Sequence, residues 1–228
     1  MSPNEPQPTI NSPETLSSPK SVAIITMSTR TPRVGPQVAA LVKSIIESNP
    51  EASSNITIHP IDLATFNLPV FNEPVIPAMV PAQASFTHQH SKDWSAAVAA
   101  HDAYVLVIPE YNDGMAGGTK NAIDYLKNEW DGKPAMVVSY GIQGGKLASE
   151  QAHGSIQRQG VKTTVTRPNL VFFGSAGPEL YSAMLQGELG EQTRKQWTEE
   201  ESVNILKGFG ELRALLFEPI PVLEEKKA

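Results

Sequence analysis

Short apolar runs rich in β-branched residues alternate along this chain with segments of helical periodicity, and that alternation limits the possible folds more than any other feature. The clearest run, 103–108, carries no charged side chain and ends at Pro109, as a strand buried on both faces of a parallel sheet does. Elsewhere apolar residues recur at helical spacing, as at Val38, Leu41 and Ile45. The alternation predicts an α/β fold: a doubly wound, five-stranded parallel sheet with helices on both faces and any ligand at the carboxyl ends of the strands.

The predicted elements follow one another from residue 21 to residue 217. The predicted strands are 21–27, 56–60, 103–108, 134–140 and a last strand in two parts, 161–166 and 170–173, broken at Pro168. The predicted helices are 36–48, 94–101, 118–128, 146–159 and a final helix that includes 205–216, with Thr198 and Glu201 as a capping box in front of it. The loop 63–90 is unusually long for a compact domain, so we expect it to serve function or oligomerisation.

Composition excludes several classes of function. The 24 acidic and 18 basic residues give a net charge of −6 with no cationic run, which disfavours binding to nucleic acid or to an anionic membrane surface. The absence of cysteine excludes disulfides, thiolate catalysis and cysteine metal sites, and no other cluster of metal ligands is legible. No apolar run approaches the roughly 20 residues of a membrane helix. We expect one cytoplasmic domain, 21–217, between a flexible, proline-rich tail, 1–20, and a C-terminal tail, 218–228.

Three loops that follow predicted strands carry unusual residues. The first, 28–35, places Ser28, Arg30 and Arg33 just before a helix N-terminus. Free backbone N–H groups and the helix dipole favour an anion there, and a guanidinium can hold a phosphate in a bidentate fork. From the residues alone, ordinary loop hydroxyls and solvated arginines are an equal alternative.

The second and third loops are rich in glycine. The loop 109–118 combines three glycines with Tyr111 and Asn112, so its backbone can approach a flat ligand and read its polar edge; alternatively, Glu110 and Asp113 are solvated turn residues. The loop 139–145 superficially resembles a phosphate-binding P-loop, but the glycine–lysine spacing is one residue too short and the magnesium-binding hydroxyl is missing. Hydrolysis of ATP or GTP is therefore disfavoured.

Together these segments resemble the NADPH-dependent FMN reductase family, which has a flavodoxin-like fold and includes quinone and azo-dye reductases. The resemblance covers residues 21–173. It rests on Ser28-Thr-Arg30, on Pro109-Glu-Tyr-Asn112 with Lys120-Asn-Ala-Ile-Asp124, and on Gly141-x-x-Gly144-Gly145.

The sequence departs from the family pattern at three positions near these motifs. Met27 stands where Gly is usual, and Ala116 and Thr119 stand where Pro and Leu are common. These departures bear on affinity and substrate preference more than on the fold.

The resemblance implies FMN as the cofactor, held by residues of all three loops. Ser28 and Arg30 match the family's phosphate-binding residues, with Arg33 and Val34 as further contacts. The turn against the isoalloxazine ring, which meets the ring largely through its main chain, matches Pro109, Glu110, Tyr111 and Asn112. The loop that closes the other side of the ring matches Tyr140, Gly141, Gly144 and Gly145, and backbone amides between Gly141 and Gly145 are the candidates to stabilise the reduced ring.

The implied activity is that of an FMN-dependent NAD(P)H oxidoreductase. Hydride passes from NADPH or NADH to FMN, and two electrons then pass to a quinone, free flavin or azo compound. Because FMN carries the chemistry, we predict no catalytic side chain and no metal. The expected partners are small-molecule electron acceptors and further copies of the chain in a dimer or tetramer. Two alternatives are a non-enzymatic FMN-binding redox sensor or interaction protein, and a flavin-free descendant in which Met27 has spoiled the site.

Overall fold

The fold is built around one parallel sheet. The computed structural model describes residues 18–81 and 86–218, so most of the two predicted tails lies outside the described residues. All strand pairs are parallel, in the order β2-β1-β3-β4-β5, which is the flavodoxin-like order. The α/β prediction is confirmed. The strands are β1 Lys20–Thr26, β2 Ile56–Asp62, β3 Ala103–Pro109, β4 Pro134–Gly141, β5 Lys162–Thr163 and β6 Asn169–Val171.

The fifth position of the sheet is filled by two short strands, as the break at Pro168 predicts. β5 pairs with the start of β4, at Pro134 and Ala135, and β6 pairs with its end, from Ser139 to Gly141. Proline lacks the N–H group that a continuous strand would need at the break. The Pro168 carbonyl still accepts a hydrogen bond from the Ser139 N–H at 3.0 Å.

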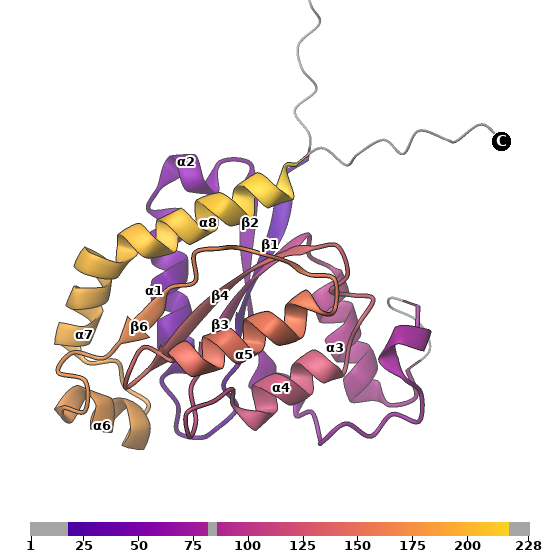
Figure 1. The fold of residues 1–228 in the computed structure, drawn as a ribbon, viewed down its shortest axis with the longest axis horizontal. Coiled ribbons are helices and arrows are strands. Elements are labelled where there is room, and N and C mark those ends of the chain that lie inside the picture. The colour runs from indigo at the N-terminus through magenta and orange to yellow at the C-terminus, as the bar shows by residue number, and fades with distance from the viewer. Residues whose placement is uncertain (1–17, 82–85, 219–228) are drawn as a thin grey trace, which may run out of the picture.

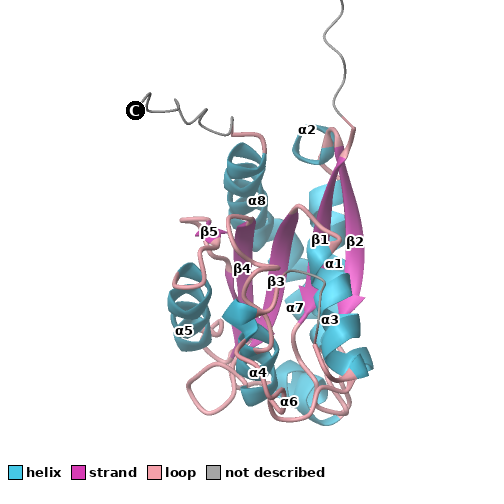
Figure 2. Ribbon diagram, turned by 90° about the vertical axis from the view of Figure 1, so that its right-hand side faces the viewer, coloured by secondary structure: helices cyan, strands magenta, loops and turns pink. Residues whose placement is uncertain are grey.

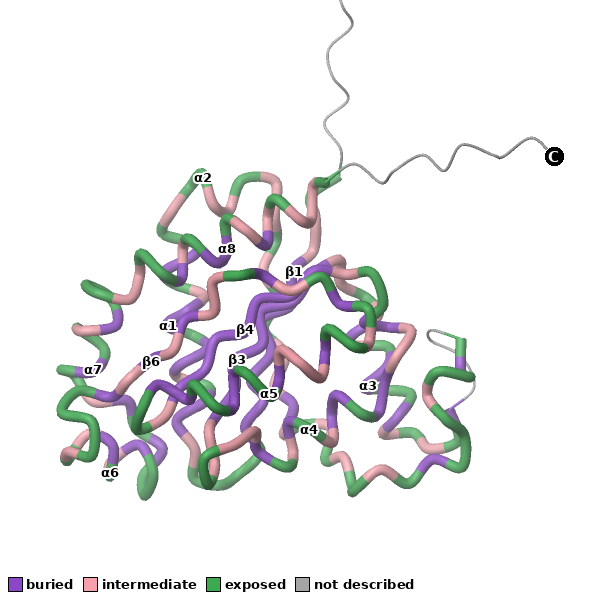
Figure 3. Tube along the Cα trace, viewed as in Figure 1, coloured by how far each residue is buried: buried purple, intermediate pink, exposed green. Residues whose placement is uncertain are grey.

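Helices cover both faces of the sheet (Figures 1 and 2). Val22 and Ile24 of β1 belong to the core beneath α1 and α8, whereas Ala23 and Ile25 belong to the core beneath α3, α4 and α5. β3 and β4 are buried almost throughout (Figure 3). The helices are α1 Gly35–Glu47, α2 Pro50–Ser53, α3 Gln89–Ala99, α4 Gly117–Asp124, α5 Lys146–Gln157, α6 Pro178–Leu185, α7 Glu191–Gln196 and α8 Ser202–Leu216, and the loop 63–90 contains short turns of 3₁₀ helix, Leu63–Phe66 and Pro77–Met79.

The predicted capping box before α8 is wrong. α7 continues through a π-helical turn, Trp197–Glu201, directly into α8. Inside this helical run the Thr198 hydroxyl donates to the Arg194 carbonyl four residues earlier, at 2.8 Å, as a mid-helix threonine commonly does. The Trp197 side chain is fully buried and its indole N–H donates to the Val171 carbonyl. Tertiary packing of Trp197 therefore overrides the local start signal.

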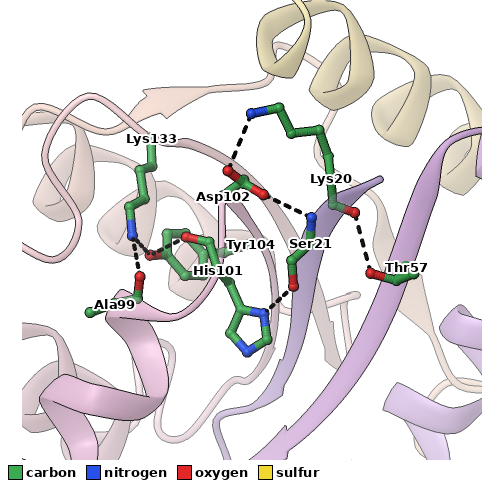
Figure 4. A network of polar contacts seen from close by, with 8 residues as sticks. All are labelled: Lys20, Ser21, Thr57, Ala99, His101, Asp102, Tyr104 and Lys133. Carbon is green, nitrogen blue, oxygen red and sulfur yellow. Dashed lines mark hydrogen bonds and ion pairs between the residues drawn. The ribbon is translucent and has the colours of Figure 1, made fainter. Parts of the chain in front are cut away.

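A polar network joins the amino-terminal ends of β1 and β3 (Figure 4). The Asp102 carboxylate accepts the Ser21 N–H at 2.8 Å, and the Ser21 hydroxyl lies 2.7 Å from His101 Nδ1. The Lys133 ammonium donates to the Tyr104 hydroxyl at 2.9 Å. The network stabilises the end of the sheet at which β1 and β3 begin, opposite the carboxyl ends of the strands.

Within the described residues, no helix combines the length and the apolar character that a membrane span requires.

Candidate functional site

A cleft of about 580 Å³ lies at the carboxyl ends of the central strands. This volume is within the usual range of small-molecule sites, about 300–1,000 Å³. All three predicted loops contribute to its walls, and α6 adds a fourth wall. The lining residues are Arg30, Arg33, Val34, Pro109, Glu110, Tyr111, Asn112, Asp113, Tyr140, Gly141, Ile142, Gln143, Phe172, Leu180, Ala183 and Met184.

Nine of the twelve predicted site residues line this cleft; Ser28, Gly144 and Gly145 do not. These three are buried; Ser28 begins the first loop, and Gly144 and Gly145 end the third. Their contribution to the site is therefore through the shape of the loops and, for Ser28, through a hydroxyl at the base of the first loop.

The first loop presents two arginines in different settings. Arg30 is exposed, and its Nη1 donates to the Met184 carbonyl of α6 at 2.7 Å. Arg33 is half-buried and uses Nη2 in an ion pair with Asp62 at 2.6 Å, while its buried Nη1 has no hydrogen-bond partner within the described structure. Since Asp62 partly neutralises Arg33, Arg30 is the stronger candidate for binding a dianion.

The Ser28 hydroxyl is buried and makes no well-formed hydrogen bond in the described structure, although the Tyr140 hydroxyl lies near enough to interact with it. A side chain added at Gly35, the first residue of α1, would collide with the Ser28 hydroxyl and would approach the Tyr140 hydroxyl to 2.8 Å. Burial raises the pKa of Tyr140, so the phenol stays protonated. Two neutral hydroxyls thus meet the N-terminus of α1. Pro36 has no N–H and the Gln37 N–H donates to the Val34 carbonyl at 2.9 Å, so the Gly35 N–H is the one that this first turn leaves over.

The second loop is held in a fixed shape by its own backbone and by α5. Tyr111 and Gly114 exchange N–H···O=C hydrogen bonds of 3.0 and 3.2 Å. Asn112 and Asp113, between them, both adopt left-handed backbone angles, with φ of 50° and 57°, which asparagine and aspartate tolerate better than other non-glycine residues. The Gln151 side chain of α5 accepts the Met115 N–H at 2.8 Å.

Glu110 has a structural role that the sequence did not reveal. Its carboxylate accepts the N–H groups of Leu147 and Ala148, at 3.0 and 3.2 Å, in the first turn of α5. The residue before that helix, Gly145, has no side chain that could cap it, and a carboxylate is favoured by the positive end of the helix dipole. Glu110 is therefore no solvated turn residue; it joins the second loop to the third.

The third loop depends on its glycines. Gly144 and Gly145 have φ of +76° and +72°, and a Cβ on Gly144 would come within 2.7 Å of the Asn169 carbonyl oxygen. The Ser139 hydroxyl donates to the Gly144 carbonyl and accepts from the Asn169 side chain, both at 2.7 Å. The Gly144 N–H is engaged by the Gly141 carbonyl at 3.1 Å, so this amide does not point to a ligand.

Sequence reasoning missed the wall that α6 and the end of β6 provide. Leu180, Ala183 and Met184 follow the i, i+3, i+4 spacing of a single helix face. Together with Phe172 they make this side of the cleft apolar. The helical spacing was visible in the sequence, but nothing local indicated that the helix would cross to the first loop.

The side chains and backbone groups at the cleft suit the chemical groups of FMN. The open hydrogen-bonding capacity of Ser28 and Arg33, together with Arg30 and the N-terminus of α1, suits a phosphate. The wall that contains Tyr111 and the wall that contains Gly141 leave a cleft suited to a flat ring system. No group of three or more potential metal-binding side chains occurs within the described parts of the chain.

Comparison with known proteins identifies the family. The model of the NADPH-dependent FMN reductase family matches residues 20–177. The chain belongs to this family. The resemblance inferred from the three loops is thereby confirmed, and α6, which begins at Pro178, lies just beyond the matched region.

Relatives of this FMN reductase family member cover much of its length. The NAD(P)H-dependent FMN reductase ntnL of a Nectria species is 48% identical over 200 residues, which are 87% of this chain and 98% of the relative. The NAD(P)H-dependent FMN reductase LOT6 of Saccharomyces cerevisiae is 41% identical over 133 residues, 57% of this chain and 70% of the relative. Further relatives are named quinone reductase and NADPH azoreductase, at 31% and 30% identity.

A solved structure agrees with the fold. The flavoenzyme NAD(P)H:(acceptor) oxidoreductase FerB from Paracoccus denitrificans superimposes with a TM-score of 0.57, covering 84% of this chain and 97% of FerB at 19% identity.

The positions that depart from the family pattern lie in well-packed surroundings. The Met27 side chain is fully buried in the core beneath α3, α4 and α5, and its carbonyl accepts the Thr119 hydroxyl at 3.1 Å. Ala116 is also buried. The larger residue before Ser28 thus points into the core, on the face of β1 away from α1.

Proposed function

We propose that this protein is an NAD(P)H-dependent FMN oxidoreductase that passes two electrons from reduced nicotinamide to a flat organic acceptor. The observation that carries the proposal is the convergence of the three loops on one cleft in a chain of this family. FMN, when bound, supplies the capacity to accept a hydride and to deliver two electrons. The residues of the chain bind and orient the reactants.

We assign the phosphate end of the site to the first loop. Arg30 provides a charged fork, the Ser28 hydroxyl provides a donor, and the N-terminus of α1 provides the Gly35 N–H and the positive end of the helix dipole. Arg33, already paired with Asp62, adds a weaker positive field.

We assign the ring end to the second and third loops. Pro109, Tyr111 and Asn112 form one wall, and Gly141 with Tyr140 forms the other. The Glu110 carboxylate fixes the distance between the two walls. Because this preorganised cleft already has its shape, little ordering cost is expected on binding.

The acceptor class and the assembly belong to the same proposal. Relatives named quinone reductase and NADPH azoreductase support quinones and azo compounds as acceptors, and free flavin is a third flat candidate. We propose a homodimer or homotetramer, supported by exposed apolar side chains beside the cleft, namely Phe173, Tyr181, Met184 and Leu185. We propose the cytoplasm as the place of action.

The test is an absorption spectrum of the purified protein, reconstituted with FMN, before and after anaerobic NADPH. We expect the flavin absorbance to bleach and to return when a quinone such as menadione is added, with ping-pong kinetics in the steady state. A flavin spectrum that NADPH and NADH both leave unchanged would support the non-enzymatic alternative, and a chain that takes up no FMN would support the flavin-free one.

A further inference from the structure

The segment 178–190, here named the strap, crosses from the end of β6 to the phosphate-binding loop. It comprises α6 and the turn that follows, and in Figure 2 α6 lies below the lower ends of the strands. Leu180, Ala183 and Leu189 of the strap are buried in the same core cluster as Val34 of the first loop. The strap and the first loop therefore belong to one hydrophobic core.

One side chain of α1 makes two hydrogen bonds to the end of the strap. Gln37, half-buried in the first turn of α1, donates from Nε2 to the Gly187 carbonyl at 2.9 Å and accepts the Leu189 N–H on Oε1 at 3.2 Å. The same oxygen accepts from Arg194 at 3.4 Å. Both ends of the amide are used, so Gln37 fixes the strap in position and in orientation.

The strap also approaches the backbone of the first loop too closely for a side chain. Gly187 has φ of +75°, and a Cβ there would lie 2.9 Å from both the N and the O atom of Arg33. A few residues earlier, the Met184 carbonyl accepts the Arg30 guanidinium. The Arg30 side chain is thus hydrogen-bonded to the strap, and the Arg33 backbone lies close to Gly187 of the strap.

We propose that Gln37 is a positioning residue for phosphate binding, acting through the strap. It touches no part of the cleft itself. By tying the strap across the loop 28–35, it holds that loop and the Arg30 side chain in one arrangement before any ligand arrives. Preorganisation of this kind raises affinity because less conformational freedom is lost on binding. The inference rests on the proposed function, since it assumes that FMN is the ligand of the loop.

The test compares FMN with riboflavin, which has the same ring but no phosphate. Flavin-free protein is titrated with each ligand, and dissociation rates are followed by flavin fluorescence. For Gln37→Ala we expect the Kd of FMN to rise about tenfold, because the strap and the loop 28–35, no longer held by Gln37, must then be ordered when FMN binds. The Kd of riboflavin should change by less than about twofold, because riboflavin has no phosphate for the loop to bind.

Three further variants test whether the change in FMN affinity comes from the contact between Gln37 and the strap. Gln37→Met keeps the length and the neutral charge of the side chain but has neither the donor for Gly187 nor the acceptor for Leu189, so it should raise the Kd of FMN as Gln37→Ala does. Gly187→Ala, which forces the strap away from Arg33, should reproduce the Gln37→Ala pattern. Gln89→Ala is the matched control, because Gln89 is an exposed glutamine in the first turn of α3 that donates to Asp93 of the same helix and lines no part of the cleft.

Equal weakening of FMN and riboflavin in Gln37→Ala, or no change in either, would overturn the proposal. Urea unfolding of each flavin-free variant identifies a folding defect, and if Gln37→Ala has one, the nearly isosteric Gln37→Met decides the question. If the variants differ from the wild type in FMN binding as expected but the wild-type protein never oxidises NAD(P)H, the proposed function alone is refuted. A wild-type chain that binds neither flavin refutes both.

Discussion

The polar side chains at the two ends of the sheet differ in whether they have hydrogen-bond partners. At the amino-terminal end, Asp102, Ser21 and His101 satisfy one another (Figure 4). At the carboxyl end, the Ser28 hydroxyl and Arg33 Nη1 are buried and make no well-formed hydrogen bond in the described structure. An unsatisfied buried polar group costs stability. Such groups also occur near the amino-terminal end, at Trp130 Nε1 and Thr163 Oγ1, but only those of Ser28 and Arg33 belong to the loop that lines the cleft, where a ligand can complete them. Substitutions at the two ends should accordingly separate stability from flavin binding.

The largest effect is expected where the carboxyl end depends on backbone shape. Gly144→Ala places a Cβ 2.7 Å from the Asn169 carbonyl at a φ of +76°, and we expect the free energy of unfolding to fall by about 2–3 kcal/mol, with FMN binding lost. Urea unfolding and a flavin titration measure both. Gly154→Ala, in α5 with open space around it, is the control and should be neutral or slightly stabilising. A Gly144→Ala protein with normal stability would show that the loop can adapt.

Arg30→Ala tests a charged group at the carboxyl end without disturbing the core. The loss of a charge-assisted hydrogen bond to phosphate should weaken FMN binding by about 1.5–3 kcal/mol, whereas unfolding of the flavin-free protein should hardly change because Arg30 is exposed. Fluorescence titration gives the affinity. Arg158→Ala, at an exposed arginine outside this cleft, should leave the affinity unaltered. Unchanged FMN affinity in Arg30→Ala would remove the phosphate role from this residue.

Asp102→Ala tests the opposite end and should give the opposite result. It removes the acceptor of the Ser21 N–H and of the Lys20 ammonium, so we expect the free energy of unfolding to fall by about 1–2 kcal/mol. FMN affinity should stay at the wild-type value, since the network lies at the far edge of the sheet. Asp93→Ala, on the exposed face of α3, controls for the loss of a surface carboxylate. A drop in FMN affinity would show that the two ends are coupled.

Ser28→Ala is the sharpest test of the contrast because stability and binding should move in different directions. Removing a buried hydroxyl that makes no well-formed hydrogen bond in the described structure should leave the flavin-free protein unchanged or more stable by up to about 1 kcal/mol. FMN binding should weaken by about 1 kcal/mol, the net value of one hydrogen bond. Denaturation of the flavin-free form and titration of the same sample give both numbers. A destabilised flavin-free variant would contradict the idea that this hydroxyl is kept for a ligand.

The smallest expected effect is a pH dependence at the amino-terminal end. Burial, together with the charges of His59 and Lys133, lowers the pKa of His101 below its usual value of 6.5. The unfolded chain therefore binds the proton more readily, so stability from this residue is present above pH 6.5 and declines as pH falls through that value toward the lower folded pKa. Urea unfolding between pH 8 and pH 5 should show a decline that is smaller in His101→Asn. An identical slope in the variant would assign the decline to other groups.

The fold could be predicted because its signals are local. The fully apolar run of β3 and the helical spacing of α1 each arise from neighbouring residues. The nine predicted residues that line the cleft were likewise found from loops that directly follow strands. The contact between Arg30 and Met184 joins residues 154 positions apart, and no periodicity encodes such a pairing. The failed capping box at Thr198 has the same origin, since burial of Trp197 decided the local structure.

The bond between Glu110 and the start of α5 constrains any exchange of loops within the family. One carboxylate serves both walls of the cleft, so a transplanted second loop without its acidic residue would leave two amides of α5 without an acceptor. A transplanted third loop of different length would move the N–H groups of Leu147 and Ala148 out of reach of the Glu110 carboxylate. A chimera designed to alter acceptor choice should therefore carry the two segments together as a single cassette.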